Sequence, residues 1–229
     1  MREAYGLAHR EAINALRSGG DVLDCGAGSG HLYQQTLRPA GVNADRYTGV
    51  EWHPDSVAQA QGLDIRRGDL NQPLRFATDS FRCVIGLSVL EHLLKPCAFL
   101  RECHRVLEPG GTLIILTPNI STYFTVALIL AGRMPSSGPD PDSAQLIKSK
   151  ELFRVMGDEF VRDVDSDTPQ HRHLIVFSYI ALRGYLRMLD FREVRGRGFG
   201  LYPFPQVTQP VLEKLDPYHC HQMVFFAIK

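Results

Sequence analysis

The 229 residues suffice for one large domain, or for one domain with a sizeable insertion. The 25 basic and 25 acidic side chains balance, so no global charge directs the chain to nucleic acid or to an anionic membrane. The five cysteines form no Cys-x-x-Cys pair, which favours buried thiols in a reducing compartment over a disulfide framework. No apolar run approaches the roughly 20 residues that span a bilayer. We therefore expect a cytoplasmic protein.

The first half of the chain alternates β-rich runs with helical patterns, which is typical of a parallel α/β sheet. An opening helix is expected at about residues 3–17. The expected strands lie at residues 21–24, 47–50, 63–67, 81–87 and 112–117. The helices between them are expected at 30–38, 54–61 and 96–107, and Pro109-Gly110-Gly111 ends the last of these.

After residue 118 this alternation breaks. Residues 119–170 contain helix candidates at 121–131 and 144–160, separated by a loop rich in Pro, Ser, Gly and Asp. A structureless loop of that length is unusual in a compact domain, so we expect an inserted helical lid or substrate subdomain within a single domain, residues 1–229. The core then resumes with a helix at 178–189, with Ser178 as its N-cap. Strands at 191–195 and 223–228 suit an antiparallel edge hairpin.

The strongest motif is the turn Gly26-x-Gly28-x-Gly30 between the first strand and the following helix. Glycine lets the backbone turn tightly and approach a ligand, and the helix N-terminus offers N–H groups to an anionic group. Dinucleotide-binding folds instead have the spacing G-x-G-x-x-G. Asp24, which precedes the turn, would repel a pyrophosphate but attract the amino and sulfonium groups of S-adenosylmethionine. The turn therefore favours that cofactor over a nicotinamide dinucleotide or a turn without a ligand.

Polar side chains follow the next three strands. Glu51 ends the second strand, where a carboxylate can accept both ribose hydroxyls. After the third strand, Asp69 can accept the adenine amine with Leu70 against the ring, and Ser88 follows the fourth. Carboxyl ends of parallel strands form the crevice in which open α/β sheets bind ligands. Trp52, the single tryptophan, is expected either to stack on the adenine or ribose or to pack in the core.

These segments resemble the class I S-adenosylmethionine-dependent methyltransferases, specifically type 11 methyltransferase domains and the ubiquinone-biosynthesis-like enzymes. The resemblance covers about residues 20 to 119 and returns weakly at the start of the late helix. The matching segments are VLDCGAGSG (22–30), YTGVEWHPDSV (47–57), RRGDL (66–70), DSFRCVIGLSVLEHL (79–93) and LRECHRVLEPGGTLIILTPN (100–119).

The resemblance implies a Rossmann-like three-layer sandwich with a seven-stranded, mostly parallel sheet of order 3-2-1-4-5-7-6. It also implies S-adenosyl-L-methionine as the cofactor and methyl transfer to a small-molecule acceptor. Cys25 stands where family members often carry an aliphatic residue or another small one. Together with the pattern above, the expected cofactor-binding residues are Asp24, Cys25, Gly26, Ala27, Gly28, Gly30, Glu51, Trp52, Asp69, Leu70 and Ser88.

Methyl transfer from a sulfonium is an in-line displacement, for which a protein mainly holds the reacting groups in line and excludes water. A hydroxyl acceptor also needs a base, and His92 is the candidate, although Glu-His-Leu at a helix start is also common as packing. His171, His173 and Tyr202 are the candidate acceptor contacts. The aromatic and apolar residues of the insertion suggest an apolar or aromatic acceptor; packing of a lid onto the sheet explains them equally well.

Two other functions compete with this interpretation: a nicotinamide-dependent oxidoreductase, which the G-x-G-x-G spacing and Asp24 argue against, and a binding or regulatory protein. A protein of this fold could keep the cofactor and act through a partner, as a binding or regulatory protein. His171 and His173, with His219, His221 and Asp216, could form a metal site, but alternating histidines are not a specific signature, and we expect no metal. Nucleic acid is disfavoured as a substrate, because the chain is neutral and has no Asn/Asp-Pro-Pro-Tyr/Phe segment for a flipped base.

Overall fold

The computed structural model describes residues 2–52, 62–147, 149–152 and 172–229. At its centre is a seven-stranded sheet of order β3-β2-β1-β4-β5-β7-β6, which confirms the order that the resemblance implies. The strands are β1 (Val22–Cys25), β2 (Tyr47–Glu51), β3 (Asp64–Arg67), β4 (Phe81–Leu87), β5 (Leu107–Pro118), β6 (Glu193–Phe199) and β7 (Gln222–Ile228). Strands β1 to β5 pair in parallel, and β7 runs antiparallel to both β5 and β6.

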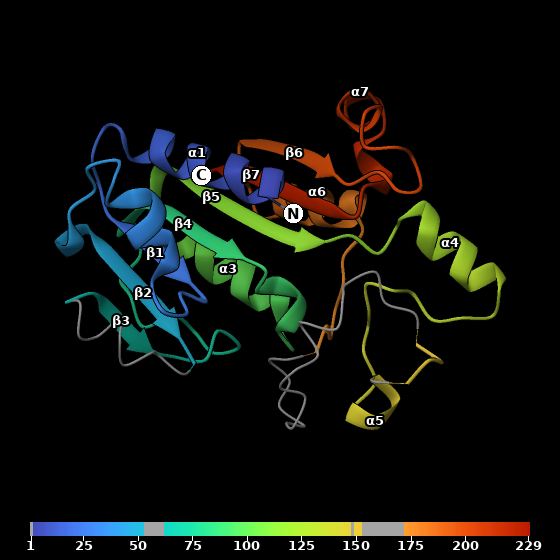
Figure 1. Cartoon of the computed structure of the whole chain (residues 1–229). Helices are drawn as coiled ribbons and strands as arrows, with labels where there is room; N and C mark the ends of the chain where they lie inside the picture. The colour runs from blue at the N-terminus through green and yellow to red at the C-terminus, as the bar shows by residue number, and fades with distance from the viewer. Residues whose placement is uncertain (1, 53–61, 148, 153–171) are drawn as a thin grey trace.

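Helices cover both faces of this sheet (Figure 1). The helices are α1 (Arg2–Leu16), α3 (Pro96–Val106), α4 (Tyr123–Leu130), α5 (Ala144–Ile147), α6 (Tyr179–Met188) and α7 (Gln209–Leu215). In β5, Leu113 and Ile115 pack into the core on the side of α3 and α6, whereas Ile114 and Leu116 pack into the core on the side of α1. Because side chains alternate along a strand, β5 is buried on both faces as a central strand.

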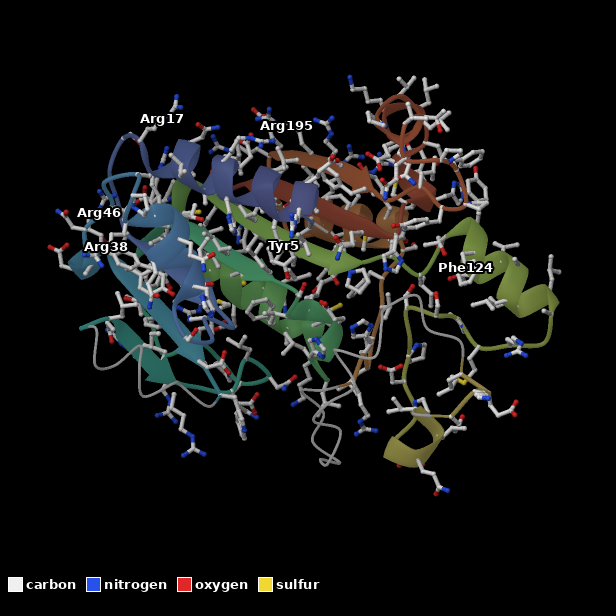
Figure 2. The ribbon with its side chains drawn as sticks, viewed as in Figure 1. Tyr5, Arg17, Arg38, Arg46, Phe124 and Arg195 are labelled. Carbon is white, nitrogen blue, oxygen red and sulfur yellow. The ribbon has the colours of Figure 1, made fainter. Side chains whose placement is uncertain are left out.

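Helix α1 packs closely because its inner face is made of small side chains. Ala4, Ala8 and Ala12 recur every four residues and are completely or almost completely buried, which is the spacing of one helix face. The first turn of the helix brings Tyr5 toward the carboxyl end of β4, where its hydroxyl lies 2.8 Å from Ser88 Oγ (Figure 2). The opening helix thus reaches the edge of the sheet at which a ligand is expected.

The strands and helices of the first half lie within one or two residues of their predicted bounds, with two exceptions. The helix expected at 30–38 is mainly a π-helical turn, Tyr33–Leu37, and β5 begins five residues before the predicted strand. Helix α3 ends at Val106, before the Pro-Gly-Gly segment that was expected to end it. The backbone of that segment is part of β5, and Gly110 N and Gly111 O pair with the backbone of Lys229. The helix expected at 54–61 lies outside the described residues.

In the described part of the insertion after β5, α4 and the single turn α5 are helical, whereas residues 131–143 and 149–152 form turns and loops. The remainder of the helix expected at 144–160 lies largely outside the described residues, and closure of the insertion as a lid stays a prediction. Ser178 caps α6 as predicted, with its hydroxyl accepting from Ala181 N at 3.2 Å. Helix α7 lies between the two late strands, where no helix was predicted. In the described part of the chain no helix has the length and apolar character needed to cross a membrane.

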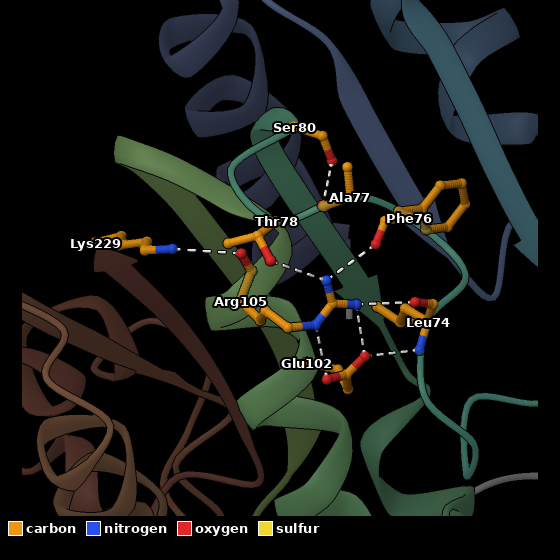
Figure 3. A network of polar contacts seen from close by, with 8 residues as sticks. All are labelled: Leu74, Phe76, Ala77, Thr78, Ser80, Glu102, Arg105 and Lys229. Carbon is orange, nitrogen blue, oxygen red and sulfur yellow. Dashed lines mark hydrogen bonds and ion pairs between the residues drawn. The ribbon is translucent and has the colours of Figure 1, made fainter.

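Arg105 and Glu102 of α3 fasten the loop between β3 and β4 (Figure 3). The Arg105 guanidinium donates to the carbonyl oxygens of Leu74 at 2.9 Å and of Phe76 at 3.0 Å. It also pairs with both carboxylate oxygens of Glu102, at 3.0 and 2.8 Å. Glu102 Oε2 in turn accepts from Leu74 N at 2.8 Å. The loop is therefore held by charge-assisted bonds to its main chain.

We expect Arg105→Met to lower the free energy of unfolding by about 2 kcal/mol, because it removes several bonds to a charged group that is only partly exposed. Calorimetry should then show a fall in Tm of roughly 4–8 °C. As a control, Arg195→Met removes the exposed pair with Glu193 and should change Tm by less than about 2 °C. Equal shifts in the two variants would show that this network contributes no more than a surface pair.

Candidate functional site

A cavity of about 470 Å³ opens at the carboxyl ends of β1 to β4. That volume lies within the range of small-molecule and cofactor sites. Residues from the Gly-rich turn and from the segments after β2, β3 and β4 meet around it. The expected site residues that line the cavity are Gly26, Glu51, Trp52, Asp69, Leu70, Ser88 and His92.

The Gly-rich turn has a backbone that favours glycine. Gly26, with φ +77°, and Gly28, with φ +51°, are both in the left-handed region. A Cβ atom on Gly26 would lie 2.4 Å from Val89 Cγ2, whereas one on Gly28 would meet no atom within 4 Å. The first glycine thus permits packing of the turn against the segment after β4. The second leaves the main chain open to a closely approaching ligand.

Glu51 is joined to this turn by hydrogen bonds. Its Oε2 accepts from Gly28 N at 2.9 Å, and its Oε1 accepts from Trp52 N at 2.7 Å. Trp52 is 42% exposed, with the Arg67 guanidinium 5.9 Å from its ring centroid. The interpretation of Trp52 as a core residue is therefore wrong, and its indole borders the cavity.

Asp24 is buried immediately before the turn, with 4% of its surface exposed. Its Oδ2 accepts from Tyr47 Oη at 2.7 Å. Burial raises the pKa of Asp24 to about 6, and the hydrogen bond from Tyr47 opposes this rise. The same burial, together with the nearby carboxylate, raises the pKa of Tyr47. The phenol therefore stays protonated and acts as a donor to Asp24.

Other expected cofactor residues do not line the cavity. Cys25 is fully buried, and a Cβ atom on Gly30 would lie 2.6 Å from Leu63 Cδ1, so Gly30 permits close packing next to β3. The expected residues absent from the lining are Asp24, Cys25, Ala27, Gly28 and Gly30. Four of them, Asp24, Cys25, Ala27 and Gly30, are buried, whereas Gly28 is exposed.

Asp69 is positioned by a chain of hydrogen bonds that runs through Asn71, which was not predicted. Asp69 Oδ1 accepts from the Asn71 main-chain N at 2.9 Å and from Asn71 Nδ2 at 3.0 Å. Asn71 Oδ1 then accepts from Leu94 N at 2.8 Å and Lys95 N at 3.1 Å. This chain joins the turn after β3 to the segment after β4. The spacing Asp-x-Asn, typical of an Asx turn, was the available sequence signal.

Ser88 has φ +54°, an uncommon backbone conformation for a non-glycine residue. Its hydroxyl is bonded to Tyr5 of α1. Burial raises the pKa of Tyr5, so the phenol is protonated at neutral pH. Because Tyr5 is 83 residues away in sequence and belongs to no motif, the sequence offered no sign of this contact.

His92 lines one end of the cavity, and His173, which is not part of the lining, lies beside it with ring centroids 5.2 Å apart. Of the other expected acceptor contacts, Tyr202 is 42% exposed and absent from the lining, and His171 lies outside the described residues. The site therefore brings His173 to His92, but not Tyr202.

Asp216 and His219, which were also considered as metal ligands, take part in a different contact. His219 Nδ1 lies 2.8 Å from the Asp216 carboxylate, which also accepts from Tyr123 Oη at 2.6 Å. The His219 ring stacks on Tyr123 with centroids 4.5 Å apart. Within the described ranges, these side chains and His221 form no cluster of potential metal ligands. They join the start of α4 to the segment after α7.

Comparison with known sequences gives one family model and several relatives. A methyltransferase domain matches residues 23–115. A probable S-adenosylmethionine-dependent methyltransferase from Mycolicibacterium smegmatis is 36% identical over 51% of this chain and 43% of the relative. A probable phthiotriol/phenolphthiotriol dimycocerosates methyltransferase 2 from Mycobacterium ulcerans is 31% identical over 79% and 68%. A ubiquinone biosynthesis O-methyltransferase from Maricaulis maris is 31% identical over 55% and 50%. The chain thus covers between 43% and 68% of the length of these relatives.

Two solved structures share the fold at low identity. A SAM-dependent methyltransferase from Archaeoglobus fulgidus superposes with a TM-score of 0.61 at 18% identity, covering 100% of this chain and 95% of that one. The 1,6-didemethyltoxoflavin-N1-methyltransferase of Burkholderia thailandensis, solved with its substrate and S-adenosylhomocysteine, has a TM-score of 0.53 at 18% identity. That match covers 97% of this chain and 78% of the other. At such identities the likeness concerns the fold alone.

Proposed function

Because this chain belongs to the class I S-adenosylmethionine-dependent methyltransferases, we propose that it transfers the methyl group of S-adenosylmethionine to a small-molecule acceptor. The observation that carries the proposal is the arrangement at the carboxyl ends of β1 and β2. There the open main chain of Gly28 lies beside the Glu51 carboxylate. This arrangement fits the ribose and methionine parts of the cofactor of that family.

Each part of the cofactor has a residue of matching chemistry. The Glu51 oxygens each accept one main-chain N–H. A carboxylate oxygen can accept more than one hydrogen bond, and each of these is proposed to accept from a ribose hydroxyl as well. Asp69, with its side chain fixed by Asn71, is proposed to accept the adenine amine, with Leu70 and Trp52 beside the ring. Asp24 is proposed to attract the amino group from behind the turn.

The acceptor is proposed to enter on the His92 side of the cavity. That side is walled by Leu87, Val89, Leu93 and Leu94, which favours an apolar or aromatic molecule. Bound S-adenosylmethionine supplies an electrophilic methyl group, and the walls position the acceptor in line with it while excluding water.

His92 is proposed to promote loss of the acceptor's proton. Its Nδ1 lies 3.0 Å from the carbonyl oxygen of Arg172, and a carbonyl only accepts, so Nδ1 carries the hydrogen. In the neutral ring the lone pair is then on Nε2. His92 is thus held in a tautomer suited to this role.

Calorimetric titration with S-adenosylmethionine and S-adenosylhomocysteine tests the proposal. We expect dissociation constants on the order of micromolar and no binding of NAD. In Gly28→Arg the open space is filled, and affinity should fall by roughly 100-fold or more, about 3 kcal/mol. Gly41→Arg is the matched control, because Gly41 also has a left-handed backbone with no atom near its Cβ position. Its N–H donates to Arg38 O, whereas that of Gly28 donates to Glu51 at the cavity. Equal affinity of the two variants, or no binding to the wild type, would refute the proposal.

A further inference from the structure

A carboxylate and a second imidazole lie next to His92, the only one of the three residues that lines the cavity. Glu91, His92 and His173 each offer one potential ligand atom, and these atoms lie within 4.8 Å of one another. Two histidines and one glutamate form the ligand set of many catalytic zinc sites, in which the fourth position is left for water or substrate. We propose that these three residues bind a divalent cation of the zinc type, which in turn binds the acceptor.

The histidines are oriented as metal ligands are. His92 Nδ1 lies 3.0 Å from Arg172 O, and His173 Nδ1 lies 2.7 Å from Ser137 O. Because carbonyl oxygens only accept, each Nδ1 carries the hydrogen and each Nε2 presents its lone pair. A metal-ligating histidine almost always donates its other N–H in this way, since the bond fixes the tautomer and the ring orientation.

Glu91 provides the negative charge. Its side chain is buried, with 2% of the residue exposed, and its Oε2 accepts from Thr117 Oγ1 at 3.0 Å. In the described part of the chain no Lys or Arg forms an ion pair with it. A buried carboxylate is normally paired with a cation or coordinates a metal. A divalent ion between Glu91 and the two imidazoles would supply that charge.

The spacing allows an ion to be shared. Ligand atoms about 2.0–2.1 Å from a tetrahedral Zn²⁺ stand about 3.4 Å apart, so the three atoms must approach by at most about 1.4 Å from their 4.8 Å limit. Among the described residues no hydrogen bond joins the three side chains to one another. Small side-chain rotations therefore suffice.

The ion would define the acceptor class, and this step rests on the proposed function. A hydroxyl oxygen bound at the open position becomes more acidic, and the proton of its O–H bond passes to water. The electron pair of the resulting oxygen forms the new C–O bond as the C–S bond breaks, and the sulfonium becomes a neutral thioether. His92 then promotes loss of the proton through the ion. The acceptor is a phenol or another hydroxyl compound with an apolar body.

Zinc binding to the untagged chain tests this inference. After removal of metals with a chelator, equilibrium dialysis against Zn²⁺ with elemental analysis should show one ion per chain. Co²⁺ should give the visible absorption of a protein-bound, low-coordinate ion. Glu91→Gln, His92→Gln and His173→Gln should each weaken Zn²⁺ binding by about 10- to 100-fold or more. His219→Gln is the matched control, because it removes an imidazole that also lies beside a carboxylate, and it should bind like the wild type.

Parallel titration with S-adenosylhomocysteine separates this inference from the proposed function. Retained binding of that ligand shows that a variant is folded and that its cofactor site is intact. If Glu91→Gln unfolds, the two histidine variants, whose side chains are only half-buried, decide the question. A wild type that binds S-adenosylhomocysteine but no Zn²⁺ would overturn the metal site alone. Equal Zn²⁺ affinity in the wild type and both histidine variants would do the same.

Discussion

Replacing Glu51 by Ala is expected to weaken binding of S-adenosylhomocysteine by roughly 100-fold. The carboxylate is proposed to accept two ribose hydroxyls, and each hydrogen bond to a charged group contributes about 1.5–3 kcal/mol. A net loss of about 3 kcal/mol corresponds to roughly 100-fold in affinity. The variant also removes the acceptor of the Gly28 and Trp52 N–H groups, so the turn itself becomes less ordered. Calorimetric titration of both proteins measures the difference.

Two further variants isolate the role of the charge. Glu51→Gln keeps the shape and one acceptor oxygen, so its affinity should fall by only about tenfold. Glu193→Ala removes an exposed acid of β6 that pairs with Arg195 and should bind like the wild type. If Glu51→Ala bound S-adenosylhomocysteine as tightly as the control, the assignment of Glu51 to the ribose would be wrong.

The residues that could be predicted for this site are those at strand ends. A buried strand followed by a polar residue or a glycine turn is visible in one sequence, which is how Gly26, Glu51, Asp69 and Ser88 were found. Parallel topology then brings these strand ends to one edge of the sheet. Their convergence on one cavity therefore follows from local patterns and the fold class.

The partners of these residues are set by tertiary contacts, which leave no local pattern. Tyr5 meets Ser88 because α1 lies across β4 and β5. Likewise, Glu91 and His173 meet only because the segment after the insertion returns to the end of β4, where Leu174 N donates to Glu91 O. In the sequence, Glu91 read as part of a helix start, and His173 was grouped with distant histidines.

The sheet was predictable to a similar extent. Periodicity locates the strands of the first half, but their order came from the family resemblance. The length of β5 was not predicted, because glycines usually interrupt regular structure. Here Gly110 and Gly111 instead form backbone hydrogen bonds with Lys229, the residue that follows β7. Helix α7 was missed because its seven residues are too few to show a clear apolar period.

Asp24 presents a conflict between stability and binding. Burial raises its pKa in the folded chain from 3.8 to about 6. The pKa of Asp24 is higher in the folded chain than in the unfolded chain. The contribution of this group to the free energy of unfolding is therefore greatest below pH 3.8 and falls as the pH rises through about 6. A shift of about 2 units corresponds to about 3 kcal/mol at pH 7. The ionised carboxylate therefore destabilises the fold at neutral pH.

We accordingly expect Asp24→Asn to raise the free energy of unfolding at pH 7 by about 1–3 kcal/mol. An asparagine oxygen can still accept from Tyr47, so the packing around β1 and β2 is kept. Thermal unfolding of the variant should occur about 2–4 °C higher for each kcal/mol gained. The gain should shrink as the pH is lowered from 7 to 4, because the wild-type carboxyl is then protonated. A variant less stable than the wild type at pH 7 would contradict this account.

The same substitution should weaken binding of S-adenosylhomocysteine at pH 7 by at least about tenfold, because it removes the charge that attracts the ligand's ammonium group. In the wild type, affinity should fall as the pH decreases through about 6, where Asp24 gains its proton. Tyr47→Phe removes the hydrogen bond that stabilises the ionised Asp24. The pKa of Asp24 should therefore rise, and the loss of affinity should begin at a higher pH. An unchanged pH profile in Tyr47→Phe would mean that Asp24 does not act through its charge. If the profile shifts, the cofactor requires an ionised Asp24, and the fold keeps the carboxylate there despite its effect on stability.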